Sequence, residues 1–215
     1  MKLTGELKLI VGSIIVTIGI IAGTVFFFAG GSGSVMVNTQ NLIRPESPGR
    51  GDKNAKVKIV EFADFECPAC GYVAPVIDQL VRDYKDKIYV VYRHFPLSQH
   101  KNAKKGAEAF EAAGEQGKYW EMSDKLYSTQ SQWSDLSDPS EAFVGFAKEL
   151  NLDTVKFKKD LTSEKYNKTI TDGLSDGDHI GINVTPTFII NGEKVEGAKS
   201  LEEFKKIIDK ILTEK

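Results

Sequence analysis

The chain has 215 residues, of which 41% are hydrophobic and 10% aromatic, an ordinary composition for a globular domain. Its 28 basic and 30 acidic side chains are interspersed and give a net charge of −2. This balance excludes a nucleic-acid-binding polycation, an acidic tail and a largely disordered chain. Two cysteines are also too few for the multi-disulfide framework of a small secreted protein.

Residues 9–30 contain no ionisable side chain. As a helix rising about 1.5 Å per residue, this segment would reach roughly 33 Å, which is enough to cross a bilayer core. Lys2 and Lys8 precede it and Arg44 is the first cation after it, so the positive-inside rule places residues 1–8 in the cytoplasm. The sequence therefore predicts a single-pass anchor in the cell membrane with an extracytoplasmic domain. A cleaved signal peptide is the alternative.

Residues 31–54 are rich in Gly and Ser and include Pro45 and Pro48, a composition that predicts a flexible linker. The linker contains Arg50-Gly51-Asp52, a tripeptide associated with cell adhesion. Three residues recur easily by chance, so we assign no adhesive function to them. The remaining residues, 55–215, are predicted to form one domain with a proper core.

The two cysteines stand three positions apart, between a predicted strand and a predicted helix. Residues 57–62 have the β-branched, partly alternating pattern of a strand. Apolar residues of one helical face follow Cys70. Cys67 would then be the N-cap and Pro68 the first helical residue, a position that proline favours.

This placement predicts different chemistry for the two thiols. A thiolate at Cys67 would face the free backbone N–H groups of Ala69 and Cys70 and the positive end of the helix dipole. Its pKa would fall, which makes Cys67 the attacking group. Cys70 lies one turn into the helix and would resolve a mixed disulfide.

Three other interpretations of the cysteine pair compete with redox chemistry. Two inert core thiols would hardly lie at a helix start beside proline. A zinc site would need His94, His100 or His179, and none has a finger-like spacing. A structural disulfide would close a four-residue loop that constrains the unfolded chain little. We therefore expect a redox-active Cys67–Cys70 pair with no metal and no nucleotide cofactor.

The rest of the chain predicts a mixed α/β domain. A buried strand is expected over 87–95, helices from about 98 to 179, a hairpin over 187–196 with its turn at Asn191-Gly192, and a terminal helix over 201–211.

Four separated motifs between residues 55 and about 213 resemble one known family. They are the strand and turn over 60–70, Pro75 in the following helix, residues 116–120, and residues 181–192. Together they resemble the DsbA-like thiol:disulfide oxidoreductases of the thioredoxin superfamily. The resemblance implies an α/β thioredoxin fold with a helical subdomain inserted at about 98–180, here preceded by one transmembrane helix.

The resemblance also implies roles for residues around the cysteines, with Pro68 and Ala69 supporting the active site. Glu61 stands where the family keeps a buried acid that exchanges protons with the second cysteine; a solvent-facing strand glutamate is the alternative. Thr185-Pro186 would be a cis peptide that lets the Thr185 backbone pair with an extended substrate beside Cys67, and a plain turn proline is the alternative. His94 and His100 receive no role.

One departure from DsbA concerns the residues between the cysteines. DsbA has a histidine there that stabilises the thiolate, whereas this chain has Pro68-Ala69. The substitution, with acidic Glu66 beside Cys67, indicates a weaker oxidant.

The expected function is extracytoplasmic thiol–disulfide oxidoreduction, which forms or exchanges disulfides in exported proteins. The expected partners are exported cysteine-containing proteins and a membrane quinone-linked reoxidant of the DsbB or vitamin K epoxide reductase type, with no nucleic acid, and the protein is expected to be a monomer. Two alternatives stay open: a disulfide reductase or isomerase, and a non-redox holdase or scaffold.

Overall fold

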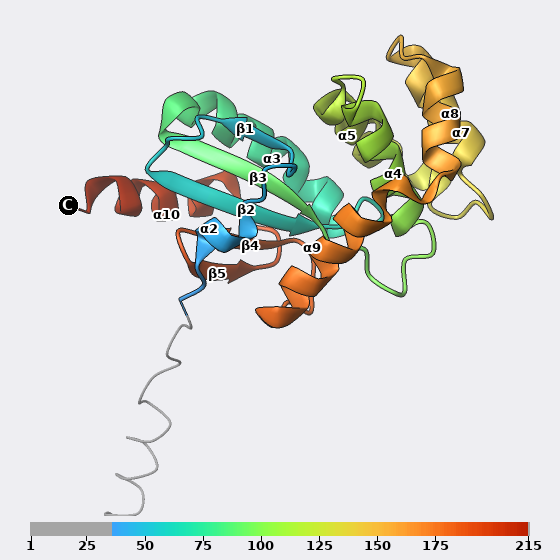
Figure 1. Cartoon of the computed structure of the whole chain (residues 1–215). Helices are drawn as coiled ribbons and strands as arrows, with labels where there is room; N and C mark the ends of the chain where they lie inside the picture. Colours follow the sequence, from blue (N-terminus) through green and yellow to red (C-terminus); the bar gives the residue numbers. More distant parts are fainter. Residues whose placement is uncertain (1–35, 215) are drawn as a thin grey trace, which may run out of the picture. The chain divides into compact units, whose positions relative to one another are not determined.

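The computed structural model describes residues 36–214 (Figure 1). The predicted cytoplasmic segment 1–8 and the predicted anchor 9–30 lie outside these described residues. Among the helices of residues 36–214, none combines the length and the apolar composition needed to cross a membrane.

Within residues 36–214, five strands form one mixed sheet in the order β1-β3-β2-β4-β5. Strands β2 and β3 are parallel, and the three other pairings are antiparallel. The strands are β1 (Gly49–Gly51), β2 (Val57–Ala63), β3 (Ile88–His94), β4 (Thr187–Ile190) and β5 (Glu193–Glu196). The predicted strands and the predicted hairpin are confirmed.

Helices cover both faces of the sheet and form the long connection between β3 and β4 (Figure 1). The α-helices are α2 (Thr39–Leu42), α3 (Pro68–Tyr84), α4 (Ala103–Gly114), α5 (Tyr119–Ser128), α6 (Gln130–Trp133), α7 (Ser140–Glu149), α8 (Thr154–Thr162), α9 (Asn167–His179) and α10 (Leu201–Thr213). The 3-10 turns η1 (Lys85–Lys87) and η2 (Glu164–Tyr166) precede β3 and α9.

The central strands are buried on both faces because each face is covered by a different set of elements. Ile59 on β2 packs in one apolar cluster with Ile77 of α3 and Phe204 of α10. Val60, the next residue of β2, packs on the opposite face in a cluster that includes Ile182, just after α9. Alternation along the strand thus supplies both layers of the core.

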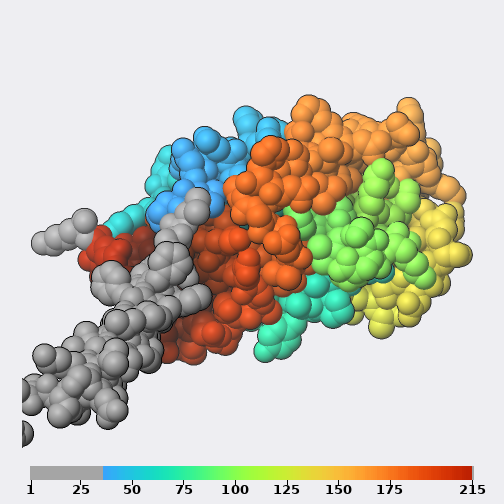
Figure 2. All heavy atoms as spheres, turned by 90° about the horizontal axis from the view of Figure 1, so that it is seen from below, coloured from blue at the N-terminus to red at the C-terminus, as the bar shows by residue number. Residues whose placement is uncertain are grey.

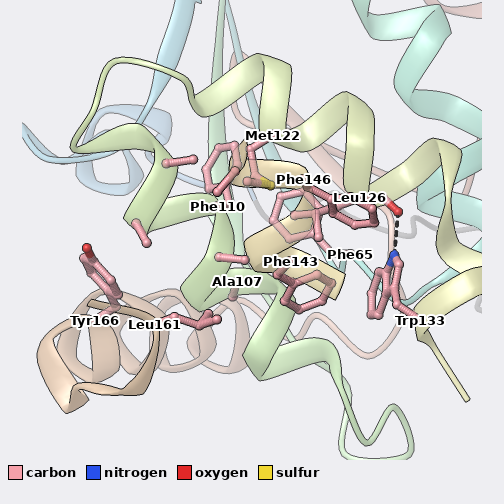
Figure 3. Packing of buried hydrophobic residues seen from close by; sticks show 14 of the residues in the cluster. Phe65, Ala107, Phe110, Met122, Leu126, Trp133, Phe143, Phe146, Leu161 and Tyr166 are labelled. Atoms are coloured by element: carbon pink, nitrogen blue, oxygen red, sulfur yellow. Dashed lines mark hydrogen bonds between the residues drawn. The ribbon is translucent and has the colours of Figure 1, made fainter. Parts of the chain in front are cut away.

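The helices between β3 and β4 build a third apolar cluster (Figure 3). Phe65, from the turn after β2, lies in this cluster with Phe110 of α4 and Phe143 of α7. The indole Nε1 of buried Trp133 donates a hydrogen bond to the backbone oxygen of Leu126, 2.9 Å away. The helical subdomain and the loop before Cys67 therefore share one core.

The predicted flexible linker is wrong over residues 36–54, which belong to the folded domain. In this segment β1 pairs with β3, the backbone oxygen of Pro48 accepts a hydrogen bond from the Tyr92 N–H at 2.9 Å, and Leu42 is buried. Gly51 has a φ of +92°, and a Cβ there would lie 2.2 Å from the Ile88 backbone oxygen. Glycine is therefore needed here because the two strands approach closely, and it does not indicate a flexible linker.

An ion-pair network also fixes the start of the described chain. Asp176 of α9 binds Arg44, with Nη2 and Oδ1 2.8 Å apart, and buried Arg93 of β3, with Nη2 and Oδ2 2.6 Å apart. Arg93 donates a further hydrogen bond to the Leu42 oxygen at 2.7 Å. Figure 2 shows the blue segment that follows residue 35 lying against the orange segment that contains α9.

Candidate active site

Cys67 lies at the junction of β2 and α3. It is the N-cap of α3, with extended backbone angles, and Pro68 is the first helical residue, as the sequence predicts. Buried Asp64 fixes the turn before it: the carboxylate accepts hydrogen bonds from the backbone N–H groups of Glu66 at 2.7 Å and Leu97 at 2.9 Å.

The two thiols have opposite electrostatic environments. A hydrogen bond from the Cys70 thiol, hydrogen bonding to Thr185 and the backbone N–H groups of Cys70 and Ala69 lower the pKa of Cys67 to about 5, although burial opposes them. Burial raises the pKa of Cys70 well above its usual range, and the neighbouring Cys67 adds to this effect. Both cysteines are free thiols in this structure. At neutral pH the pair thus holds a thiolate at Cys67 and a proton on Cys70.

The segment before β4 lies directly beside Cys67. The Thr185–Pro186 peptide bond is cis, as predicted, and the Thr185 oxygen lies 3.4 Å from the sulfur of Cys67. The Thr185 hydroxyl is also buried, and the Thr185 side chain contributes to the lowered pKa of Cys67. The Thr185 backbone oxygen therefore faces Cys67 from this segment.

Glu61 lies on β2, opposite Tyr92 of β3 and Phe188 of β4. It is 5% exposed, so the solvent-facing alternative is wrong. Burial raises the pKa of Glu61 to about 7, the charge of Arg50 lowers it, and Asp78 raises it. The carboxylate also raises the pKa of Cys70, so the two groups are electrostatically coupled.

Gln130 of α6 is a site residue that the sequence analysis missed. Its Nε2 donates hydrogen bonds to the backbone oxygens of Phe65 at 2.7 Å and Cys67 at 3.0 Å. A Cβ at Gly71 would lie 2.8 Å from the Gln130 side-chain oxygen, so the glycine leaves room for this contact. No local pattern marks Gln130, because its role depends on packing across the two subdomains.

Three other polar residues serve the scaffold around the thiols. His100 Nδ1 lies 2.7 Å from the Asp64 carboxylate, and His94 Nε2 lies 2.8 Å from the Glu111 carboxylate in the core. The Glu66 carboxylate accepts a hydrogen bond from the Asn102 N–H at 2.6 Å. Within residues 36–214, no three His, Cys, Asp or Glu side chains are arranged to hold a metal ion.

Curated relatives match a segment of much longer proteins. The chain is 37% identical over 154 residues to a protein from Salinispora arenicola named Na(+)/H(+) antiporter NhaA 1, and 35% identical over 165 residues to one of the same name from Mycolicibacterium gilvum. These matches cover 71% and 73% of this chain, whereas the chain spans only 23% and 26% of the relatives. The similarity thus concerns one domain of those proteins.

Solved structures share the fold. DsbA1 from Wolbachia pipientis has a TM-score of 0.72 and 25% identity, covering 81% of this chain and 96% of that one. Oxidised BdbD from Bacillus subtilis has a TM-score of 0.70 and 21% identity, covering 78% and 94%, which shows the fold alone. The family model described as Thioredoxin matches residues 44–210, a range that includes both cysteines, Glu61 and the cis-proline segment. The chain belongs to the thioredoxin family.

Proposed function

We propose that this domain catalyses thiol–disulfide exchange on protein substrates through Cys67 and Cys70. The observation that carries the proposal is the unequal state of the two sulfurs. Cys67 lies at a helix N-terminus with its pKa lowered to about 5, and Cys70 is fully buried with its pKa raised. A thiolate beside a protonated partner thiol is the pair that this exchange requires.

The exchange proceeds through a mixed disulfide at Cys67. When the domain is oxidised, a substrate thiolate attacks the Cys67 sulfur, and Cys70 leaves as a thiolate that takes a proton from Glu61. The second substrate thiolate then attacks the substrate sulfur of the mixed disulfide and releases the Cys67 thiolate. The substrate gains one disulfide and the domain gains two electrons. The reverse sequence reduces a substrate disulfide.

Thr185 and two exposed apolar side chains support an extended polypeptide as the substrate. The Thr185 backbone lies beside the Cys67 sulfur, where it can pair with a substrate strand. Tyr72, in the second turn of α3, is 70% exposed, and Val184, next to Thr185, is 45% exposed. Exposed apolar side chains on the two segments that meet at Cys67 suit an unfolded protein segment rather than a small polar thiol.

The cellular setting completes the proposal. We place the domain outside the cytoplasm, tethered by residues 9–30, where it acts on exported proteins as a monomer and is reoxidised by a quinone-linked membrane partner of the DsbB or vitamin K epoxide reductase type. The resemblance to DsbA favours the oxidising direction, and Pro68-Ala69 between the cysteines favours a weaker oxidant, with a reductase or an isomerase as the alternative. The redox state of the pair, trapped in intact cells, distinguishes these: mostly disulfide indicates an oxidase, mostly dithiol a reductase or isomerase.

The two cysteine variants test the chemistry directly. With Cys70→Ser, mixed disulfides with substrate proteins should accumulate and disappear under reductant on a gel. With Cys67→Ser they should not, since Cys70 is 0% exposed. Insulin reduction by the full-length chain should require both cysteines. Trapping by Cys67→Ser as strong as by Cys70→Ser would refute the assigned roles, and an unaltered chain that reduces no insulin and forms no mixed disulfide would favour the non-redox holdase alternative.

A further inference from the structure

A charged residue of β1 shares the sheet face of buried Glu61. Arg50 is paired with Val90 of β3, and Glu61 is paired with Tyr92, two residues further along that strand. Residues two apart on a strand point to the same face, and paired residues on neighbouring strands do so too. Arg50 and Glu61 therefore project from one face of the sheet, the face covered by α3.

Contacts with two helices hold the Arg50 side chain in place. The guanidinium forms an ion pair with Asp78 of α3, and its Cζ lies 4.2 Å from the ring centre of Trp120 on α5. Its Nε is buried with no hydrogen-bond partner among the described residues. One part of the guanidinium is thus paired with a carboxylate, while another part has no acceptor.

These contacts also explain the Arg50-Gly51-Asp52 tripeptide. The Arg50 side chain is 20% exposed and engaged with α3 and α5, so the tripeptide is not presented as an exposed adhesive motif. Its arginine instead lies on the sheet face that carries Glu61.

We propose that Arg50 is a positioning residue of the redox site, acting as the counter-charge of the Glu61 carboxylate, and that Asp78 opposes this effect. The inference rests on the proposed exchange of a proton between Glu61 and Cys70. When that proton moves from the carboxyl oxygen to the Cys70 sulfur, a negative charge remains in a buried pocket. Arg50 stabilises this charge, and Asp78 limits the stabilisation by neutralising part of the guanidinium.

Other titratable groups also interact with Glu61 or with the Arg50–Asp78 ion pair. Those coupled to Glu61 or to the ion pair are Cys70 on α3, Tyr92 on β3, and Tyr127 and Asp124 on α5. Burial raises the pKa of both tyrosines well above the usual value, which keeps them neutral. Asp124 is exposed and faces the ion pair, and β4 contributes only apolar Phe188 opposite Glu61. Arg50 is therefore the cation that acts on Glu61 from the described residues.

The test uses two substitutions that break the same ion pair. Arg50→Gln removes the cation and should raise the pKa of Glu61, whereas Asp78→Asn frees the cation and should lower it, each by about half a unit or more. The pKa is read by carbon-13 NMR of the full-length, glutamate-labelled, reduced protein, with the Glu61 signal identified by its loss in Glu61→Gln. The pH profile of insulin reduction should move in the same two directions.

Conservative and matched variants separate this role from a structural one. Arg50→Lys keeps the charge and should leave the Glu61 titration close to that of the unaltered protein. Asp83→Asn breaks a different ion pair of α3, with Lys205, and should change nothing at Glu61. A purely structural ion pair would make Arg50→Gln and Asp78→Asn behave alike, so shifts of equal sign, or no shift, overturn the proposal. An unaltered protein that reduces no insulin would refute the proposed function, while the NMR titration would still decide whether Arg50 acts on Glu61.

Discussion

The sulfur of Cys67 lies 3.4 Å from the backbone oxygen of Thr185, although 118 residues separate them in the chain. The entire helical subdomain lies between these two positions in sequence. The contact brings the candidate nucleophile to the edge of the segment that leads into β4. A substrate strand paired with Thr185 would therefore meet Cys67 without rearrangement of the domain.

The Cys67 thiolate should be visible in the ultraviolet absorbance of the reduced protein. The pKa of Cys67 is lowered to about 5. The absorbance of the reduced protein at 240 nm should therefore rise with pH as the Cys67 thiolate forms, with a midpoint near pH 5. The absorbance change should vanish in Cys67→Ser and persist in Cys70→Ser with a higher midpoint, since the Cys70 hydrogen bond is the largest cause of the shift.

The same shift predicts a pH-dependent stability of the reduced form. A pKa depressed in the folded state contributes stability that is complete above the unfolded value and is lost as pH falls through the folded value. The reduced protein should therefore lose this contribution between about pH 9 and pH 5. Thermal unfolding of Cys67→Ser should show a weaker pH dependence over that window. An identical dependence in both proteins would contradict the lowered pKa.

Glu61 should have the opposite effect on stability. Its folded pKa of about 7 lies above the ordinary glutamate pKa of 4.5, so the unfolded chain releases the proton first and folding stability falls as pH rises from 4.5 to 7. Glu61→Gln should thus stabilise the protein above pH 7 by up to about 3 kcal/mol and have little effect near pH 4. Urea unfolding at the two pH values measures the difference. An equal effect at both would show that Glu61 is not shifted.

Gln130 should stabilise the active-site turn. Gln130→Ala removes two hydrogen bonds and leaves the backbone oxygens of Phe65 and Cys67 without this donor, which should cost about 1–2 kcal/mol in unfolding free energy. Gln132, on the same short helix, is exposed, so Gln132→Ala is the matched control and should cost nothing measurable. Equal losses in the two variants would mean that the turn does not depend on Gln130.

The N-terminal segment of the folded domain should depend on Asp176. Asp176→Ala leaves buried Arg93 without its carboxylate, which should cost about 3 kcal/mol or more, and releases Arg44. Amide hydrogen exchange at Ile43 and Ser47, whose N–H groups are hydrogen-bonded within this segment, should then be faster than in the unaltered protein. Asp172→Ala removes an exposed ion pair with Lys168 and a contact of 4.0 Å to Arg44, and should change this exchange less. Equal exchange in both variants would argue against the network.

The sequence predictions that the structure confirms rest on strong local patterns. The β-branched run over 57–62 and the Cys67-Pro68 helix start are local features, and each agrees with its place in the fold. Residues 36–54 were misjudged because their Gly and Pro content is typical of a linker, while the edge pairing of β1 depends on β3, far along the chain. The roles of Gln130 and Arg50 cannot be recognised in the sequence for the same reason, because their contacts form only when distant elements pack together.

Phe65 couples the redox centre to the helical subdomain. Phe65 lies two positions before Cys67 in the chain. Its ring stacks on Tyr92 of β3 with the ring centroids 5.1 Å apart, and it packs against Phe110 of α4 with the centroids 5.0 Å apart. An aromatic ring shared by two packed layers cannot shift in one without disturbing the other. Forming or breaking the Cys67–Cys70 bond should therefore change how often the backbone hydrogen bonds of α4 open. Amide hydrogen exchange in α4 should then differ between the oxidised and the reduced protein, although the cysteines lie on a different element.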